Sequence, residues 1–341
     1  MEETQAKYHH LIPQTYMSAW EKGTRSLQVE FLNDPSVIKT RNKKKIAGIT
    51  DYHSIKAGMI ICKKDDTNKI FSQLADCSVE IDGKIVTDTM EMNEKYSKFD
   101  KWIIKQNGGL PVNKKKIKRE IEKIKIKDIE SNWATKYESK WDTVVNDLEA
   151  AILTDKSNSI TAKHKDYLMK FYVALDWRSF QSNDAFQKVF QDFSGGLLKE
   201  IDIPKEKRFF PFLKTAEDET IHLLLLKYYR EYLNDEGVMY KHVTEGLKQT
   251  NFSFFVSTGP TYFNTSDNPS FTCFMENKLS MGLMPITPRI LMAQGKCIED
   301  TDKYLITYIS DEDVKKYNEI IRENANEFVI HFDMLPVSGN K

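Results

Sequence analysis

The spacing of apolar residues changes twice along this chain of 341 residues. Near both ends, apolar and polar residues alternate, as in Leu27, Val29 and Phe31, and this period is typical of a strand with one buried face. Between about residue 111 and residue 250, apolar residues recur every third or fourth position, as in an amphipathic helix. The two periods together predict the α+β class, with mixed strand regions at both ends around a predominantly helical middle.

Turn and cap residues place several elements. The Asp82-Gly83 pair predicts a hairpin between strands at 78–81 and 84–86. Pro111 predicts the start of a helix, and Ser310 with Asp313 predicts the capped start of the last helix. We therefore expect three regions, 1–110, 111–250 and 251–341, which fit one composite domain at least as well as separate domains.

Composition excludes some classes of protein. The chain has 50 basic and 50 acidic residues, so binding driven by total charge is excluded. It lacks GxGxxG, P-loop, HExxH and GxSxG motifs, which gives nucleotide-cradling folds, zincins and α/β-hydrolases no support. We expect a cytoplasmic protein with no membrane segment, because the start is acidic and no apolar run approaches ~20 residues. The isolated cysteines predict reduced packing residues: Cys62, Cys77, Cys273 and Cys297.

The first cluster with chemical potential is Tyr8-His9-His10-Leu11-Ile12-Pro13-Gln14. Here His10 is a candidate general base, His9 a second imidazole and Gln14 a substrate-binding amide. The alternative is a hydrogen-bonded histidine pair that fixes the start of the chain. A His-His-x-x-Pro pattern also resembles the first strand of some HNH-type nucleases, but the further ligands they need are present only as Asn33, Asn42 and His53, without matching spacing.

The second cluster is Thr265-Ser266-Asp267-Asn268-Pro269. Asp followed by Asn-Pro commonly builds a turn, because the carboxylate accepts backbone N–H groups and proline fixes the next φ. As chemistry, the same residues place a catalytic carboxylate, Asp267, beside two substrate-binding groups, Ser266 and Asn268. Both interpretations stay open. Two imidazoles and a carboxylate also form a minimal ligand set for a divalent metal ion, so metal-assisted and metal-free chemistry both stay open.

Basic residues supply candidate phosphate ligands. Arg289 follows a Pro-x-x-Pro stretch that suits a sheet edge, and Arg178 ends a helical segment. The segment from residue 114 to residue 127 contains eight basic residues and only two acidic ones, and it begins with Lys114, Lys115 and Lys116. Such runs are either solvated helix faces or footprints for a phosphate backbone.

With these residues in view, the chain resembles the bacterial domain-of-unknown-function family numbered 4238. The resemblance rests on motifs in matching order: His9-His10 with Pro13-Gln14 and Trp20, then Arg178, then Ser266 to Pro269, Pro285-x-x-Pro288, Asn318 and Ala325. The family has no assigned reaction, and proteins similar to it are candidates for defence against phage. The lysine-rich segment at 114–127 departs from the family pattern.

Two functions follow as hypotheses. One is a defence effector that hydrolyses nucleic acid, RNA or DNA, with His9, His10 and Asp267 brought together from the two ends of the chain. The other is a non-enzymatic binding or sensor module, with the basic helix as its surface for nucleic acid or a phage component. Convergence of the end motifs discriminates between them, because an isolated histidine pair cannot position a phosphodiester.

Overall fold

The computed structural model describes residues 8–23, 25–107, 109–155, 157–179, 186–192, 195, 197–274, 280–296 and 302–332. The chain forms two compact units, each assembled from separate stretches of sequence. Unit 1 comprises residues 1–50, 132–190 and 231–341, and unit 2 comprises residues 51–131 and 191–230. Both contain helices and strands, so the predicted α+β class is confirmed. The three regions expected along the sequence stay a prediction.

Unit 1 is organised around a six-stranded sheet in the order β11-β12-β13-β9-β14-β8. Neighbouring strands are antiparallel except β9 and β14, which run parallel. The strands are β8 (Ser159–Thr161), β9 (Thr250–Ser257), β11 (Phe271–Phe274), β12 (Ser280–Thr287), β13 (Ile290–Lys296) and β14 (Lys303–Ile309).

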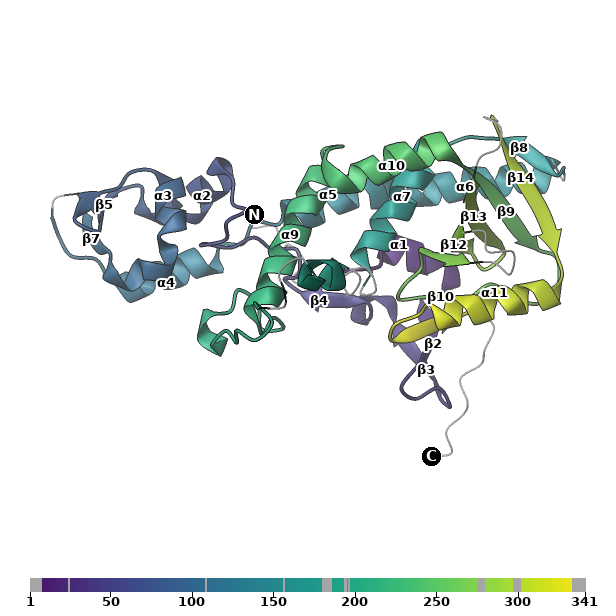
Figure 1. Ribbon diagram of the computed structural model, residues 1–341, viewed down its shortest axis with the longest axis horizontal. Helices are drawn as coiled ribbons and strands as arrows, with labels where there is room; N and C mark the ends of the chain where they lie inside the picture. Colours follow the sequence, from purple (N-terminus) through teal and green to yellow (C-terminus); the bar gives the residue numbers. More distant parts are fainter. Residues whose placement is uncertain are drawn as a thin grey trace. The chain divides into compact units, whose positions relative to one another are not determined.

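Helices cover both faces of this sheet (Figure 1). Val314 and Ile321 of α11 (Asp311–Glu323) pack against Leu283, Leu291 and other apolar side chains of one face. On the other face lie α7 (Lys165–Arg178) and α10 (Gly237–Gln249). Alternation along each strand sends successive side chains to these two cores. Ser310 and Asp313 form the predicted capping box at the start of α11.

Pro285 lies within β12, between β11 and β13 in the sheet order. The pairing of β12 with β11 extends only to Leu283, and the pairing with β13 shifts register between Pro285 and Thr287. Proline cannot donate a ladder hydrogen bond, so it fits this locally edge-like, bulged stretch.

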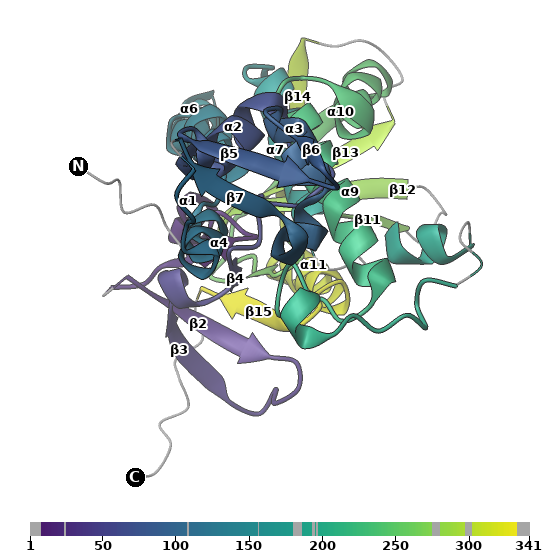
Figure 2. The same ribbon diagram turned by 90° about the vertical axis from the view of Figure 1, so that its left-hand side faces the viewer.

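A second sheet of unit 1 joins residues from both ends of the chain, in the order β10-β15-β2-β3. The strands predicted around 27–31 and 328–332 are β2 (Ser26–Phe31) and β15 (Phe328–His331), and they pair with Val29 opposite Ile330. Figure 2 shows β2 between β3 (Ile38–Asn42) and β15. The short β10 (Thr265–Ser266) completes the sheet.

The predicted apolar stripe from 133 to 152 forms a π-helical segment, η5 (Trp133–Glu138), followed by α6 (Ser139–Asp155). Its Trp141 stacks on Phe171 of α7, with ring centroids 4.0 Å apart. The tyrosine Tyr16 of α1 (Gln14–Met17) packs against the same tryptophan. The aromatic residues of the stripe are therefore core residues of unit 1.

Unit 2 contains a three-stranded sheet of β5 (Cys77–Ile81), β6 (Lys84–Ile85) and β7 (Ile103–Gln106). The Asp82-Gly83 hairpin is confirmed, since both residues have positive φ as a two-residue turn of this type requires. Its helices are α2 (Lys64–Ile70), α3 (Thr89–Glu94), α4 (Lys114–Lys123), and most of α5 (Asp128–Asn132) and α9 (Ala216–Tyr232).

The helix expected to start at Pro111 starts later. Pro111 makes a β-bridge with Lys105, and Asn113 caps α4 by accepting the N–H of Lys116 at 3.0 Å. An Asn side chain satisfies a free N–H at the helix end, which proline cannot do, and this sets the true boundary.

Among the described residues, no helix is long and apolar enough to cross a membrane. Cys62, Cys77 and Cys273 are free thiols, and Cys297 lies outside the described residues.

Candidate functional site

The histidine pair lies on β1 (Tyr8–His10), which pairs antiparallel with β4 (Gly48–Thr50) so that His9 is opposite Ile49. Alternation along the strand buries the side chain of His9 completely and leaves that of His10 half-buried. The Nδ1 atom of His10 lies 3.4 Å from Nε2 of Gln14, and its ring makes an edge contact with Tyr8. The two imidazoles therefore have different surroundings.

Arg178, far along the sequence, is brought to this motif. It ends α7, is 2% exposed, and donates to the backbone carbonyl of His10. It also donates to Oε1 of Glu138 at 3.1 Å and lies over the ring of Trp133, 4.8 Å from its centroid. Because these protein groups surround the guanidinium, the geometry favours a role in positioning β1 over the predicted role in holding phosphate.

Asp267 lies in a turn between β10 and β11, 3% exposed. Its two carboxylate oxygens accept the backbone N–H groups of Asn326 at 2.8 Å and Glu327 at 2.6 Å. Ser266 and Asn268 bond locally, and Asn268 also donates to the carbonyl of Asn324 at 2.9 Å. These contacts fasten the turn to the end of α11, and the catalytic role of Asp267 stays a prediction.

The pH dependence of stability offers a test of this turn. Burial raises the pKa of Asp267 from 3.8 to about 6, outweighing the backbone N–H groups that lower it. The folded state therefore binds the proton more tightly than the unfolded state, so this residue stabilises most below pH 3.8 and the contribution disappears as pH rises through about 6. Relative to an Asp267→Asn variant, we expect the wild type to gain stability on acidification between these values. Urea unfolding at several pH values measures it, and a pH-independent difference would contradict the assignment.

Arg289, the other predicted phosphate ligand, is also engaged by protein groups. It donates to the carbonyl of Gly259 and lies 3.3 Å from Oγ of Ser257. Its guanidinium also covers the ring of Tyr262 at 3.9 Å. The contacts are those of a side chain that closes a loop.

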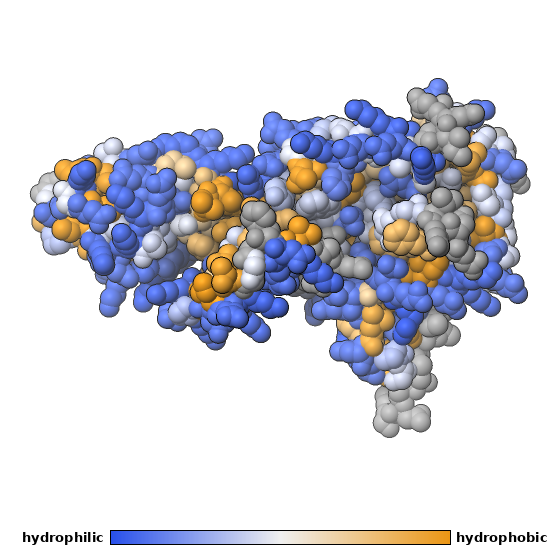
Figure 3. Space-filling view, viewed as in Figure 1, coloured by the Kyte–Doolittle hydropathy of each residue, from blue (hydrophilic) through white to orange (hydrophobic). Residues whose placement is uncertain are grey.

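The lysine-rich segment divides into engaged and exposed residues. Lys114 donates to the backbone carbonyls of Asp100 and Trp102, both at 2.7 Å. To bind a substrate as predicted, its ammonium group would have to give up one of these hydrogen bonds. Lys115, Lys116 and Arg119 are exposed and form no ion pair among the residues that the structure describes. Hydrophilic side chains cover the position of α4 in the space-filling view (Figure 3).

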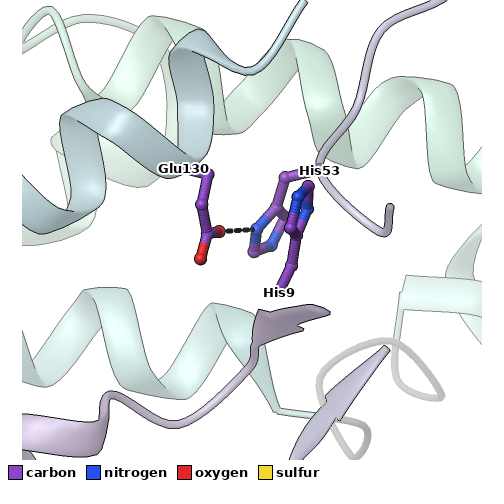
Figure 4. A group of neighbouring side chains, drawn as sticks. All are labelled: His9, His53 and Glu130. Atoms are coloured by element: carbon purple, nitrogen blue, oxygen red, sulfur yellow. Dashed lines mark hydrogen bonds and ion pairs between the residues drawn. The ribbon is translucent and has the colours of Figure 1, made fainter. Parts of the chain in front are cut away.

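One imidazole–carboxylate pair of unit 2 was not predicted as a site. Nδ1 of His53 lies 2.7 Å from Oε2 of Glu130, and the imidazole is fully buried while the carboxylate is 23% exposed (Figure 4). His53 follows β4 by three residues, and Glu130 belongs to α5. A buried imidazole held by a carboxylate is a common arrangement in catalytic and metal sites.

Aromatic side chains hold the ring of His53 in place. Tyr52 and Tyr229 both make edge contacts with it, at 5.2 Å and 5.6 Å between centroids. Nε2 of the nearby His222 donates to the carbonyl of Tyr52, 3.0 Å away, and burial lowers the pKa of His222 to about 3. His222 is therefore neutral at physiological pH, and His53 is the imidazole of this group that has a carboxylate partner.

The sequence holds little signal for this pair. His53 and Glu130 are 77 residues apart, and neither belongs to a recognisable motif. His53 drew attention only as a poorly spaced candidate ligand of an HNH pattern. Its place among Tyr52, Tyr229 and His222 could not be derived from residues so distant in sequence.

Comparison with known proteins identifies a family but no activity. A family model described as "Protein of unknown function (DUF4238)" matches residues 8–333. No curated protein and no solved structure matches the chain.

Proposed function

The chain belongs to the DUF4238 family, whose description names no activity, and we propose that it is a hydrolase acting on nucleic acid. The observation that carries the proposal is the pair formed by the buried imidazole of His53 and the partly exposed carboxylate of Glu130, with 2.7 Å between Nδ1 and Oε2. A carboxylate that fixes an imidazole is the usual support for activation of a water molecule or for metal binding. In this proposal Glu130 takes the carboxylate role that the sequence suggested for Asp267.

The reaction is hydrolysis of a phosphodiester bond. Water attacks phosphorus and loses a proton to a base of the site, a new P–O bond forms, and the P–O bond to the leaving sugar oxygen breaks. That oxygen then takes up a proton. Imidazole groups suit both proton transfers because their pKa lies near neutrality.

Phosphate binding is assigned to α4. Lys115 and Arg119 are four residues apart and Lys116 is adjacent, so the three exposed cations share one side of the helix. Cations grouped in this way bind a phosphate backbone and release its counterions. The basic helix also supports the second candidate function, a binding module without catalysis.

Salt dependence tests the role of α4. Changing Lys115 and Lys116 to Ala should weaken binding to labelled single-stranded RNA and reduce the slope of log K against log salt by about 1–1.5, because each phosphate contact contributes about 0.7. The matched control changes the exposed pair Lys315 and Lys316 of α11 to Ala. Fluorescence anisotropy at several salt concentrations measures the slopes. Equal slopes of log K against log salt in the two variants would show that α4 does not bind the RNA.

Cleavage tests the enzyme itself. Wild type, His53→Ala, His10→Ala and Asp267→Ala are incubated with total RNA, tRNA and plasmid DNA, with and without EDTA. We expect cleavage by wild type, loss in His53→Ala, and retained cleavage in Asp267→Ala if that variant folds. Loss in a folded His10→Ala would give His10 the role of base that the sequence suggested. If wild type binds RNA but cleaves none of the substrates, the result would refute the hydrolase and favour the binding module.

We propose a cytoplasmic role in defence against phage, which rests on the resemblance of the motifs. Expression of wild type and of His53→Ala in a bacterium challenged with phage tests this role. Protection that depends on His53 supports it, and equal plaque counts with and without the wild-type protein would refute it.

A further inference from the structure

We propose that a cavity in unit 1 binds a small zwitterion with an apolar body, namely an amino acid with an apolar side chain. The cavity has a volume of about 430 Å³ and lies where α6 meets β8, β14 and the start of α7 (Figure 1). Its volume is within the range of about 300–1,000 Å³ that is typical of small-molecule sites. The inference is independent of the proposed hydrolase, because His53 and Glu130 belong to unit 2.

The interior of the cavity is apolar. The lining residues of α6 are spaced by three and four positions, so they share one face of the helix: Val144, Asp147, Leu148, Ala151 and Thr154. Five lining side chains are buried and present apolar surface: Val144, Leu148, Ile160, Leu168 and Tyr304. The hydroxyl group of Tyr304 already donates to the carbonyl of Lys163, at 2.6 Å. Because a polar group buried without a partner costs free energy, the part of the ligand inside must be apolar.

Polar side chains surround the opening. The exposed lining residues are Asp147, Thr154, Thr161, Lys163 and His164. Adjacent residues of a strand point to opposite faces, but the backbone of His164 is left-handed, with φ 59°, and the chain turns there. Lys163 and His164 therefore both line the cavity, and its opening carries a cation, an imidazole and a carboxylate.

Two opposite charges at the opening have capacity for a ligand. Nε2 of His164 lies 2.9 Å from Oδ2 of Asp147, and this contact orients the carboxylate. Among the residues that the structure describes, the other oxygen, Oδ1, and the ammonium group of Lys163 make no hydrogen bond or ion pair. Oδ1 can accept from the ammonium group of an amino acid, and Lys163 can donate to its carboxylate. An apolar interior beside these two charges matches an amino acid with an apolar side chain.

Protein contacts hold the loop that carries Lys163 and His164. The N–H group of Ala162 donates to the carbonyl of Asp302 at 2.7 Å, and the Tyr304 hydroxyl group holds the carbonyl of Lys163. The strand before the loop, β8, pairs with β14, with Ile160 opposite Tyr304. A site that is already formed loses less conformational entropy when a ligand binds, which favours affinity.

Isothermal titration calorimetry on the full chain tests the site without nucleic acid. The probes are leucine, phenylalanine and two analogues of leucine that each lack one charge. The analogue 4-methylpentanoate lacks the ammonium group, and 3-methylbutylamine lacks the carboxylate. We expect leucine and phenylalanine to bind, and each analogue to bind about 10–100-fold more weakly than leucine, the loss typical of a charged hydrogen bond.

Variants assign each charge of the ligand to a residue. Asp147→Asn should weaken leucine binding by about 10–100-fold but leave 4-methylpentanoate binding unchanged, because that acid has no ammonium group. Lys163→Met should weaken leucine binding by a similar factor but leave 3-methylbutylamine binding unchanged. Ala151→Leu keeps a good helix former and fills the cavity, so it should weaken the binding of every probe. A damaged fold would not spare one analogue and affect the other.

The matched control is His242→Ala. His242 is exposed on α10, its ring makes an edge contact with Trp177 at 5.7 Å between centroids, and it does not line the cavity. We expect this variant to bind leucine like wild type. His164→Ala, which releases the carboxylate of Asp147, should weaken leucine binding and leave 4-methylpentanoate binding unchanged. Circular dichroism checks the folding of all variants.

The inference fails on any of several results. Wild type that binds neither leucine nor phenylalanine at millimolar concentration would show that the cavity takes no such ligand. Equal affinity for leucine and its two analogues, or folded Asp147→Asn and Lys163→Met variants that bind leucine like wild type, would refute the roles of the two charges. Tighter binding of adenosine monophosphate than of leucine would refute the ligand class.

Discussion

Replacing Arg178 with Met is expected to lower the free energy of unfolding by about 3 kcal/mol. Arg178 is 2% exposed and bridges Glu138, in η5, to the carbonyl of His10, on β1. Without it, the carboxylate of Glu138, which is 21% exposed, loses an ion-pair partner and the carbonyl of His10 loses a donor. Methionine fills much of the same volume, so the loss is mainly electrostatic. Urea unfolding followed by circular dichroism measures it.

A double variant separates charge from packing. Arg178→Met together with Glu138→Gln removes both charges, so we expect it to recover part of the stability lost in the single variant. A single variant within about 0.5 kcal/mol of wild type would show that the pair does not hold β1 in place. The loss of unfolding free energy in the double variant should be smaller than the sum of the losses in the two single variants. A larger loss would contradict this interpretation.

Replacing His53 with Ala is expected to lower the rate of nucleic-acid cleavage by about 10²–10⁴-fold, the contribution typical of an imidazole in acid–base chemistry. Glu130→Gln keeps the shape of the side chain but removes the charge that faces Nδ1 at 2.7 Å. We expect a smaller loss, about 10–100-fold. Single-turnover rates on a labelled RNA measure both.

His242→Ala is the control here too, because its imidazole is exposed and belongs to neither proposed site. Its rate should equal that of wild type. A folded His53→Ala variant that cleaves RNA at the wild-type rate would show that His53 and Glu130 take no part in the reaction. This conclusion would hold even if the wild type proves to be a nuclease.

Much of the fold could be predicted because its signals are local. The alternation of Leu27 and Val29, the Asp82-Gly83 turn and the Ser310 cap each depend on a few adjacent residues, and the strand, the hairpin and the capped helix are confirmed. The expectation of one buried face for that strand is wrong, because Gln28 and Glu30 on its other face are buried as well. The start of α4 was misplaced at Pro111, because the deciding interaction is the Asn113 side chain on the N–H of Lys116. Pro111 offers no cap hydrogen bond, whereas the Asn113 side chain does, and this bond determined the boundary.

Strand order could not be predicted, because it depends on pairing between distant residues. β9 pairs with β13 on one side and with β14 on the other, in opposite senses. No residue pattern in β9 encodes which neighbour it takes.

The candidate site shows the same division. The His9-His10 pair and Arg178 were singled out from sequence, and the structure connects His10 to Arg178 through a backbone carbonyl. The chemistry of Arg178 was not predictable, because Glu138 and Trp133 surround it only after folding. His53 and Glu130 were missed because their pairing joins residues with no shared motif.

The central claim is that the pair formed by His53 and Glu130 supports hydrolysis of nucleic acid. The most direct measurement is the initial rate at which purified wild type and folded His53→Ala cleave one labelled single-stranded RNA at equal concentration. The account predicts product from wild type and a rate at least about 100-fold lower from the variant. Equal rates, or no product from a wild type that binds the RNA, would contradict it.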